Sequence, residues 1–334
     1  MRKYNYVIFN MPDYKTLKHN SDGYYAICVN DLMFKDDIEI VSSPLYYAPL
    51  LVRIIFAIHH SERINKFIKL PFKSIWFPRY FKNKFKEKRP LCFIVLNYHL
   101  SNDYLNYLKT TFVGCKIVCL HRDLIKIYEK KYPGFPLNKL FDLEFSFDKN
   151  ECLKYGFIHF DEFESKICVP RASNYPLSDL FFAGKAKDRL NVLLSIYDLM
   201  TKNGINCDFV LTGVAKRNQV VRKGIHYLKR GISYKEFLYR SVNSNCLLEI
   251  NQKGAVGFTS RFLEAVMYNK KLITNNLNIK NSEFYNTKYI QCFKDVSSID
   301  CSFVKKDIGI INYNYSNEFS PLVLINRIDD MLAK

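Results

Sequence analysis

Two loops in the second half of the chain carry residue types that suit an anionic ligand. The first, GKAKDR at residues 184–189, follows an apolar strand-like run at 180–183 and precedes a helical pattern. Such a loop presents backbone N–H groups and the positive end of a helix dipole. Asp188 is placed to cap the helix. The pattern predicts a phosphate site, and the alternative is an ordinary strand–helix turn. Its glycine and cations are Gly184, Lys185, Lys187 and Arg189.

The second loop and the helix after it read GAVGFTSRFLEA at residues 254–265. Thr259 and Ser260 offer hydroxyls and helix N-terminal amides to an anion, and Arg261 adds a fixed positive charge. Glu264 lies about one turn into the helix, where a carboxylate can accept hydrogen bonds from two ribose hydroxyls. The alternative is an N-capped core helix with a surface glutamate.

The elements that must position these loops alternate between strand and helix along nearly the whole chain. Apolar runs such as 91–96 and 115–120 predict buried strands, and capping boxes at Asp148 and Ser233 predict helix starts. Repeated βαβ units predict parallel sheets that bind ligands at the carboxyl ends of their strands. We therefore expect an α/β protein with two doubly wound, Rossmann-like domains facing each other across a cleft. The predicted segments are 1–165, 166–320 and a C-terminal helix over 321–334.

The amino-acid composition narrows the kinds of molecule that the protein is expected to bind and the compartment in which it is expected to work. The 334 residues hold 50 Lys and Arg against 32 Asp and Glu, a net charge of +18. This surplus favours anionic partners such as nucleic acid, phosphorylated small molecules or acidic lipids. The ten cysteines contain no C-x-x-C pair, so we expect reduced thiols in the cytoplasm and no zinc site. Neither a signal peptide nor a transmembrane run is indicated.

A basic and aromatic stretch covers residues 62–89, with ten Lys and Arg, two Glu and the only tryptophan, Trp76. Basic and aromatic side chains together favour the interface of an anionic bilayer. The alternatives are a loop whose aromatics pack into the core and a site for single-stranded nucleic acid.

Taken together, the motifs resemble a known family. The run GFTSRFLEAVMYNKKLITNN and the upstream GKAKDR loop resemble the nucleotide-sugar-binding region of GT-B glycosyltransferases, best over residues 178–276. The stretch LEFSFDKNECLKYGF is similar to the end of the N-terminal domain in such proteins. The resemblance is to bacterial enzymes that build lipopolysaccharide and capsule. It implies an acceptor-binding domain at 1–165 and a donor-binding domain at 166–320.

The resemblance also implies roles for individual residues. Glu264 would hold the donor ribose, Lys185 and Arg189 the diphosphate, and Thr259, Ser260 and Arg261 the phosphate and sugar side. Many retaining members carry two glutamates separated by seven residues, and the earlier position here is Val256. The retaining mechanism therefore cannot simply be transferred, and the stereochemistry stays open.

An inverting reaction needs a general base in the N-terminal domain, and the candidates are Asp22, Asp13 and His19. Asp22 directly precedes a helical segment, so an ordinary N-cap is its alternative role. His99, His121 and His226 are weaker candidates for a cleft position. No D-x-D sequence follows an apolar strand, so we expect no metal and no cofactor.

The predicted activity is transfer of a sugar from a nucleotide sugar to a lipid-linked or lipopolysaccharide or capsule glycan. The enzyme would be peripheral on the inner face of the cell membrane and would bind no nucleic acid. The alternatives are a basic nucleic-acid-binding protein and a catalytically inactive GT-B scaffold.

Overall fold

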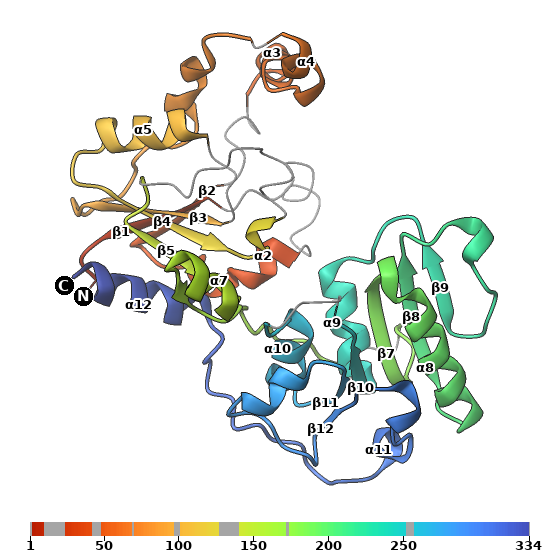
Figure 1. Cartoon of the computed structure of the whole chain (residues 1–334). Coiled ribbons are helices and arrows are strands. Elements are labelled where there is room, and N and C mark those ends of the chain that lie inside the picture. The colour runs from red at the N-terminus through yellow and green to blue at the C-terminus, as the bar shows by residue number, and fades with distance from the viewer. Residues whose placement is uncertain are drawn as a thin grey trace. The chain divides into compact units, whose positions relative to one another are not determined.

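The chain forms two compact units, each built on its own sheet (Figure 1). The computed structural model describes residues 2–9, 24–41, 48–68, 70–96, 101–126, 140–171, 174–251 and 257–333. Of these, unit 1 contains 2–9, 31–160 and 321–333, and unit 2 contains 24–30 and 161–320. Residues 24–30 of the predicted N-terminal domain thus belong to unit 2, and the chain returns to unit 2 at Asp161, slightly before the predicted boundary at 165. The C-terminal helix returns to unit 1 instead of standing alone.

The sheet of unit 1 has six strands, all parallel, in the order β2-β1-β3-β4-β5-β6. The apolar runs predicted the central strands because both faces of a parallel sheet are covered. The strands are β1 Asn5–Phe9, β2 Ile38–Val41, β3 Leu91–Leu96, β4 Lys116–His121, β5 Leu143–Ser146 and β6 Ile158–His159.

Helices cover both faces of this sheet (Figure 1). Alternate residues of β3, among them Phe93 and Val95, pack with Tyr104 and Leu105 of α5 (Asn102–Thr111). On the other face lies α12 (Pro321–Leu332), where the Asp329 carboxylate accepts a 2.7 Å hydrogen bond from the Tyr6 hydroxyl. The other helices of unit 1 are α3 Leu50–His59, α4 Glu62–Phe67 and α7 Lys149–Tyr155.

The sheet of unit 2 is also six-stranded and parallel, in the order β12-β11-β10-β7-β8-β9. This is the strand order of a doubly wound dinucleotide-binding fold. The side of the sheet to which successive strands are added changes between β7 and β10, and all strands stay parallel. The strands are β7 Ser178–Lys185, β8 Cys207–Thr212, β9 Ile225–Leu228, β10 Ser244–Glu249, β11 Lys271–Thr274 and β12 Ile290–Cys292.

Each face of this second sheet has its own apolar core. Phe182 and Leu248 lie in the core that includes α8, while Phe181 and Leu247 lie in the core that includes α9 and α10. This alternation follows from the two-residue period of a strand. The helices of unit 2 are α2 Tyr24–Cys28, α8 Leu190–Lys202, α9 Tyr234–Asn243, α10 Ser260–Met267 and α11 Ser302–Lys305.

Helix caps explain where the predicted helices start and break. The Asp148 side chain accepts from the Glu151 amide at 2.9 Å, and Ser233 accepts from the Glu236 amide at 3.1 Å, as the capping residues predicted. The Ser61 side chain caps α4, so α3 and α4 are two separate helices. Among the described residues, no helix has the length and apolar character needed to cross a membrane.

Candidate functional site

The described residues of the two predicted loops follow neighbouring strands, β7 and β10, in the sheet of unit 2. The GKAKDR loop leaves the carboxyl end of β7, and the segment leading to α10 leaves the carboxyl end of β10. In open α/β sheets, ligands bind outside the carboxyl ends of the strands at the point where the strand order reverses. The fold therefore brings both loops to the position where a ligand is expected.

Arg189 spans the two strand ends. Its guanidinium donates hydrogen bonds to the carbonyl of Lys185 at the end of β7 and to the carbonyl of Ile250 just after β10. Burial lowers the pKa of Arg189, and the positive charge of Arg261 lowers it further. Arg189 is thus a half-buried cation fixed at the junction of β7 and β10, where it adds positive charge.

Two buried donors at this junction have no hydrogen-bond acceptor among the described residues: Nε of Arg189 and Nδ2 of Asn251. Asn251 follows β10, and its backbone N–H donates to Oδ1 of Asn275 at 2.7 Å. Buried polar atoms in native proteins nearly always have a partner, and an orphaned donor calls for a water, an ion or a ligand. Both atoms are donors, so a ligand that bonds to either of them must supply an acceptor.

A buried carboxylate lies at the end of β10. Glu249 is 2% exposed and accepts hydrogen bonds from the hydroxyls of Thr259 and Thr274. Burial raises its pKa, although these two hydrogen bonds oppose the shift. The Thr259 hydroxyl also accepts from the Arg261 amide at 3.2 Å, as the N-cap of α10. Glu249 therefore fixes the start of α10 relative to the ends of β10 and β11.

Glu264 is fully buried and not on the surface. Its Oε1 accepts a 2.6 Å hydrogen bond from the Tyr234 hydroxyl of α9, and its Oε2 pairs with Arg261. Burial raises the pKa of Glu264 to about 7, against the effect of Arg261. The Arg261 guanidinium carbon lies 3.4 Å from the centroid of the Phe237 ring, a cation–π contact. Glu264 therefore joins α9 to the first turn of α10.

The remaining residues of the predicted donor site lie at the same sheet edge. Lys185 is exposed at the end of β7, and Gly184 and Ser260 are partly exposed. The expected Asp188 cap is wrong: Asp188 is exposed, and α8 has Arg189 at its N-cap position with no side-chain cap. The amides of its first turn therefore lack a side-chain acceptor.

Asp13, His19 and Asp22 lie outside the described residues, as does His99. The nearest described element is α2, which follows Asp22 directly and belongs to unit 2. Its Tyr24 ring packs edge-on against Tyr234 with centroids 5.0 Å apart. The residues after Asp22 thus contact the side chain that binds Glu264.

The weaker histidine candidates have other partners. His121 is 2% exposed, bonds to Glu144 at 3.0 Å and stacks on Phe157, so it is part of the core of unit 1. His226 on β9 lies 3.6 Å from the buried Asp208, away from the β7–β10 junction. Within the described residues, no three His, Cys, Asp or Glu side chains gather as they would around a metal ion.

Sequence reasoning missed three residues of this site: Glu249, Asn251 and Tyr234. The sequence did carry a signal for Glu249. It is the single charged residue in the apolar run CLLEI, and a carboxylate in a buried strand needs hydrogen-bonding partners. Tyr234 and Asn251 carry no such signal, since their roles depend on contacts between segments far apart in the sequence.

The basic and aromatic stretch packs partly into unit 1. Trp76, Phe77 and Phe81 are 5–6% exposed, so for these residues the core alternative is correct. Most cations of the stretch are exposed. A deletion of 73–88 would therefore remove core residues as well as charge.

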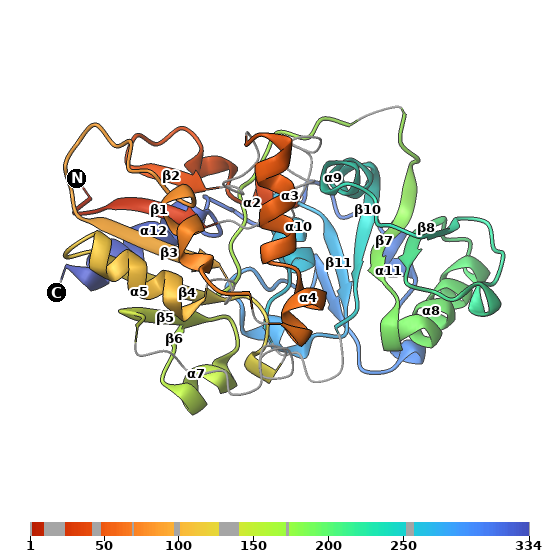
Figure 2. The ribbon, with the colours of Figure 1, turned by 90° about the horizontal axis from the view of Figure 1, so that it is seen from above.

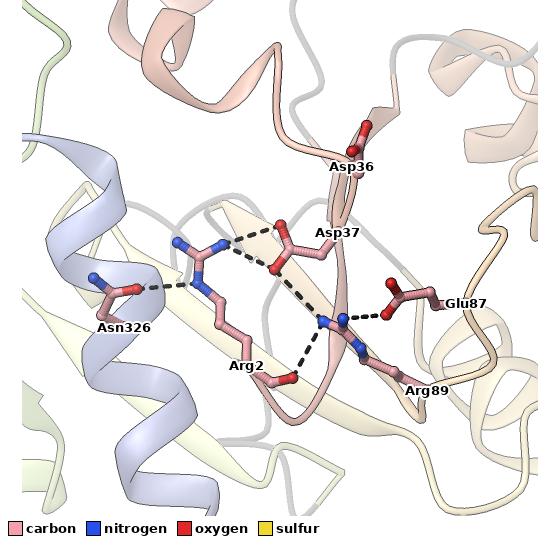
Figure 3. A pocket seen from close by; sticks show the side chains of 6 residues that line it. All are labelled: Arg2, Asp36, Asp37, Glu87, Arg89 and Asn326. Carbon is pink, nitrogen blue, oxygen red and sulfur yellow. Dashed lines mark hydrogen bonds and ion pairs between the residues drawn. The ribbon is translucent and has the colours of Figure 1, made fainter.

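A pocket of about 500 Å³ lies in unit 1, at the amino ends of β1, β2 and β3 (Figure 3). Arg2 pairs with Asp37 at 2.9 Å, and Arg89 pairs with Glu87 (Figure 3). The two arginines are neutralised by neighbouring carboxylates, and the pocket lies at the sheet edge opposite to that where α/β folds bind ligands. Its lining residues are Arg2, Asp36, Asp37, Glu87, Arg89 and Asn326.

Known proteins resemble this chain in structure and not in sequence. No protein-family model and no curated protein matches the sequence. An alpha-glucosyltransferase in complex with UDP and a 13-mer DNA matches with a TM-score of 0.50 and 10% identity, over 73% of this chain and 80% of that chain. The N-terminal domain of Candida albicans trehalose-6-phosphate phosphatase matches with a TM-score of 0.50 and 9% identity, over 92% and 91%.

A chain of the Glycosylation Associate Protein (Gap123) complex from Streptococcus agalactiae matches with a TM-score of 0.44 and 11% identity over 81% of this chain. The present chain spans 59% of the length of that one. At these identities the likeness concerns the fold. Two parallel six-stranded sheets in a two-domain α/β chain, with these neighbours, confirm the predicted GT-B fold class.

Proposed function

We propose that the chain is a glycosyltransferase that binds a nucleotide-sugar donor at the junction of β7 and β10. The observation that carries the proposal is a pair of buried donors at this sheet edge, Arg189 Nε and Asn251 Nδ2, for which the described part of the chain supplies no acceptor. A diphosphate supplies strong acceptor oxygens and negative charge, which these donors and the nearby cations suit. The solved structures of similar fold include a glucosyltransferase bound to UDP.

The diphosphate would lie against Arg189 and Lys185, with the uncapped first turn of α8 and the Gly184 loop adding amides. Thr259, Ser260 and Arg261 would line the phosphate and sugar side at the start of α10. Positive side chains and amides would then stabilise the leaving nucleoside diphosphate without a metal ion.

For Glu264 we retain the proposed contact with the donor ribose and add a positioning role. Both carboxylate oxygens already have partners, Tyr234 and Arg261. A carboxylate accepts more than two hydrogen bonds, but this one is closed to solvent, so the ribose contact requires an opening around α10.

We propose Asp22 as the general base, with Asp13 and His19 as alternatives. The support is that Tyr24, two residues further on, packs against Tyr234 of the same network. The Asp22→Asn variant is expected to bind the donor nucleotide normally and to lose most transfer activity, since general bases contribute on the order of 100-fold or more. Full transfer activity in this variant would shift the role to Asp13 or His19.

For the acceptor, we propose a lipid-linked or lipopolysaccharide or capsule glycan, with the enzyme peripheral on the inner face of the membrane. The support is the sequence resemblance and the exposed cations of residues 62–89. Nucleic acid is the competing partner for this charge. If the protein retards DNA in a gel in a salt-sensitive way and transfers no sugar to a lipid-extractable product, nucleic acid is favoured as the partner.

The donor site is tested by thermal unfolding with UDP-, GDP-, CMP- and dTDP-sugars, since a ligand of the native state raises its stability. The Arg189→Lys variant keeps the charge but removes the guanidinium, including Nε and the donors to Lys185 and Ile250. Asn251→Leu removes the second orphaned donor. Each is expected to weaken binding of the selected nucleotide sugar by roughly 10-fold or more, as for a lost hydrogen bond to a charged group. Asn251→Leu should leave the free protein at least as stable, because its donor had no partner.

The matched control is Arg222→Lys. Arg222 contacts Tyr197 and pairs with Asp198, so it is a half-buried arginine of unit 2 outside the proposed site. Its variant should keep the nucleotide affinity of the native protein. If no nucleotide sugar shifts the melting temperature, or if both site variants bind as the control does, the proposed site is wrong.

A further inference from the structure

Helix α3 turns its apolar side chains outward. Leu51, Ile54, Ile55 and Ile58 are exposed by 73, 46, 55 and 49%, and no residue of this helix is buried. Their spacing of three, four and seven residues places them in one stripe along the helix. A surface helix of a globular protein normally presents such a stripe to the core, so α3 has the reverse arrangement.

The inner side of α3 is held by aromatic contacts. Phe56 packs edge-on against Trp76 with ring centroids 5.2 Å apart, and Nδ1 of His59 accepts a 2.8 Å hydrogen bond from the Trp76 indole. His60 lies 3.2 Å from the Tyr80 hydroxyl. The outward stripe is therefore fixed by specific partners on the inner side and does not result from a loosely attached helix.

Further exposed apolar side chains follow α3 along the chain. Helix α4 follows α3 in the chain and contacts it, and Figure 2 shows α4 at the lower end of α3. Four more apolar side chains are 59–85% exposed along α4 and the segment after it: Phe67, Ile68, Phe72 and Ile75. Phe72 has a φ of 59°, a strained conformation for a bulky side chain. We call these four residues and the α3 stripe the α3–α4 surface.

The charge around the α3–α4 surface indicates which kind of partner binds there. Between residues 48 and 86, Glu62 is the only acidic residue, against nine Lys and Arg. Arg63, Arg79, Lys82, Lys84 and Lys86 are exposed. A second copy of the chain would bring the same positive charge against itself, whereas an anionic lipid surface offers apolar chains and complementary charge.

We propose that the α3–α4 surface inserts into the interface of an anionic bilayer, with the stripe of α3 as the main apolar contact. This goes beyond a basic stretch at 62–89, because α3 precedes that stretch and Trp76, Phe77 and Phe81 serve the core. The proposal deepens the proposed function, since it places the acceptor side of the enzyme at a lipid surface. The binding itself requires no nucleotide.

The test is sedimentation of the full chain with vesicles of phosphatidylcholine alone or with phosphatidylglycerol, in the absence of nucleotide. The variant Leu51→Ser, Ile54→Ser, Ile55→Ser should bind the anionic vesicles at least 10-fold more weakly than the native protein, because three apolar side chains no longer leave water on binding. The native protein should favour the anionic vesicles and lose binding at high salt.

The matched control removes three apolar side chains that are also exposed but lie elsewhere: Val113→Ser, Val221→Ser and Ile310→Ser, at positions 91–99% exposed. It should sediment as the native protein does. Equal sedimentation of the α3 variant and the control would overturn the proposal. So would a native dimer that the α3 variant converts to a monomer with vesicle binding unchanged, which would make the surface a contact between copies.

Nucleotide-induced thermal stabilisation of the same α3 variant separates this proposal from the donor site. The variant should keep the full shift, because its substitutions lie in unit 1 and the donor site in unit 2. Vesicle binding without any nucleotide shift would remove the proposed function and leave the bilayer contact in place.

Discussion

At the scale of single residues, the two buried glutamates of unit 2 have different partners. Glu249 accepts from two threonine hydroxyls, and Glu264 is shared between Tyr234 and Arg261. Removing one partner of a buried ion pair leaves the other charge uncompensated and costs about 3–5 kcal/mol. Glu264→Ala is therefore expected to destabilise the fold, and Glu264→Gln is the better probe of its role.

Glu264 should also give the stability of the protein a dependence on pH. Burial raises its pKa from 4.5 to about 7 in the folded state. The folded state thus binds the proton more tightly, and the stability this group contributes is present below the unfolded pKa and lost as pH rises through about 7. Relative to Glu264→Gln, the native free energy of unfolding should fall by on the order of 2 kcal/mol across that range.

Urea unfolding of both proteins near pH 4.5 and near pH 7.5 measures this difference. Glu283→Gln is the control, because Glu283 is an exposed glutamate of the same unit. Parallel pH profiles for the native protein and Glu264→Gln would show that the Arg261 ion pair offsets the effect of burial.

At the scale of elements, the ends of strands define the candidate site. Arg189 joins β7 to β10, Glu249 joins β10 to β11 through Thr274, and Glu264 joins α10 to α9 through Tyr234. The loop residues that suit an anion are thus held by contacts to three strands and two helices. The residues that would contact the phosphates therefore lose little entropy when a ligand binds, whereas the ribose contact of Glu264 still requires an opening around α10.

At the scale of the whole molecule, the chain returns to unit 1 through α12. Asp329 accepts hydrogen bonds from the Tyr6 hydroxyl at 2.7 Å and from the Lys3 amide at 2.9 Å. Leu324, Ile325 and Ile328 are buried. The sequence predicted α12 as a separate C-terminal segment, whereas the structure makes it part of the unit that contains the N-terminal strand.

The Asp329→Ala variant is therefore expected to weaken unit 1 and to spare unit 2. It leaves the buried Tyr6 hydroxyl without its acceptor, at a cost of about 1–3 kcal/mol. Hydrogen exchange should rise in β1, β3 and β4 and stay unchanged in β7 and β10. Equal increases in hydrogen exchange in both units would contradict the assignment of α12 to unit 1. The control is Asp330→Ala, because Asp330 is the next residue along and is exposed.

Local sequence alone determined much of this protein. Apolar runs located the central strands, caps located α7 and α9, and the βαβ alternation gave the fold class, because period and capping depend on neighbouring residues. The loops GKAKDR and GFTSRFLEA were correctly placed at strand ends for the same reason.

Only the tertiary structure decided which side chains meet. It paired Glu264 with Tyr234, buried Trp76 and turned the apolar stripe of α3 outward. It also left donors of Arg189 and Asn251 without acceptors within the described ranges. These outcomes depend on contacts between segments that lie far apart in the sequence. Hydrophobic periodicity shows that a helix has an apolar face, but what that face contacts is set by the packing of the whole chain.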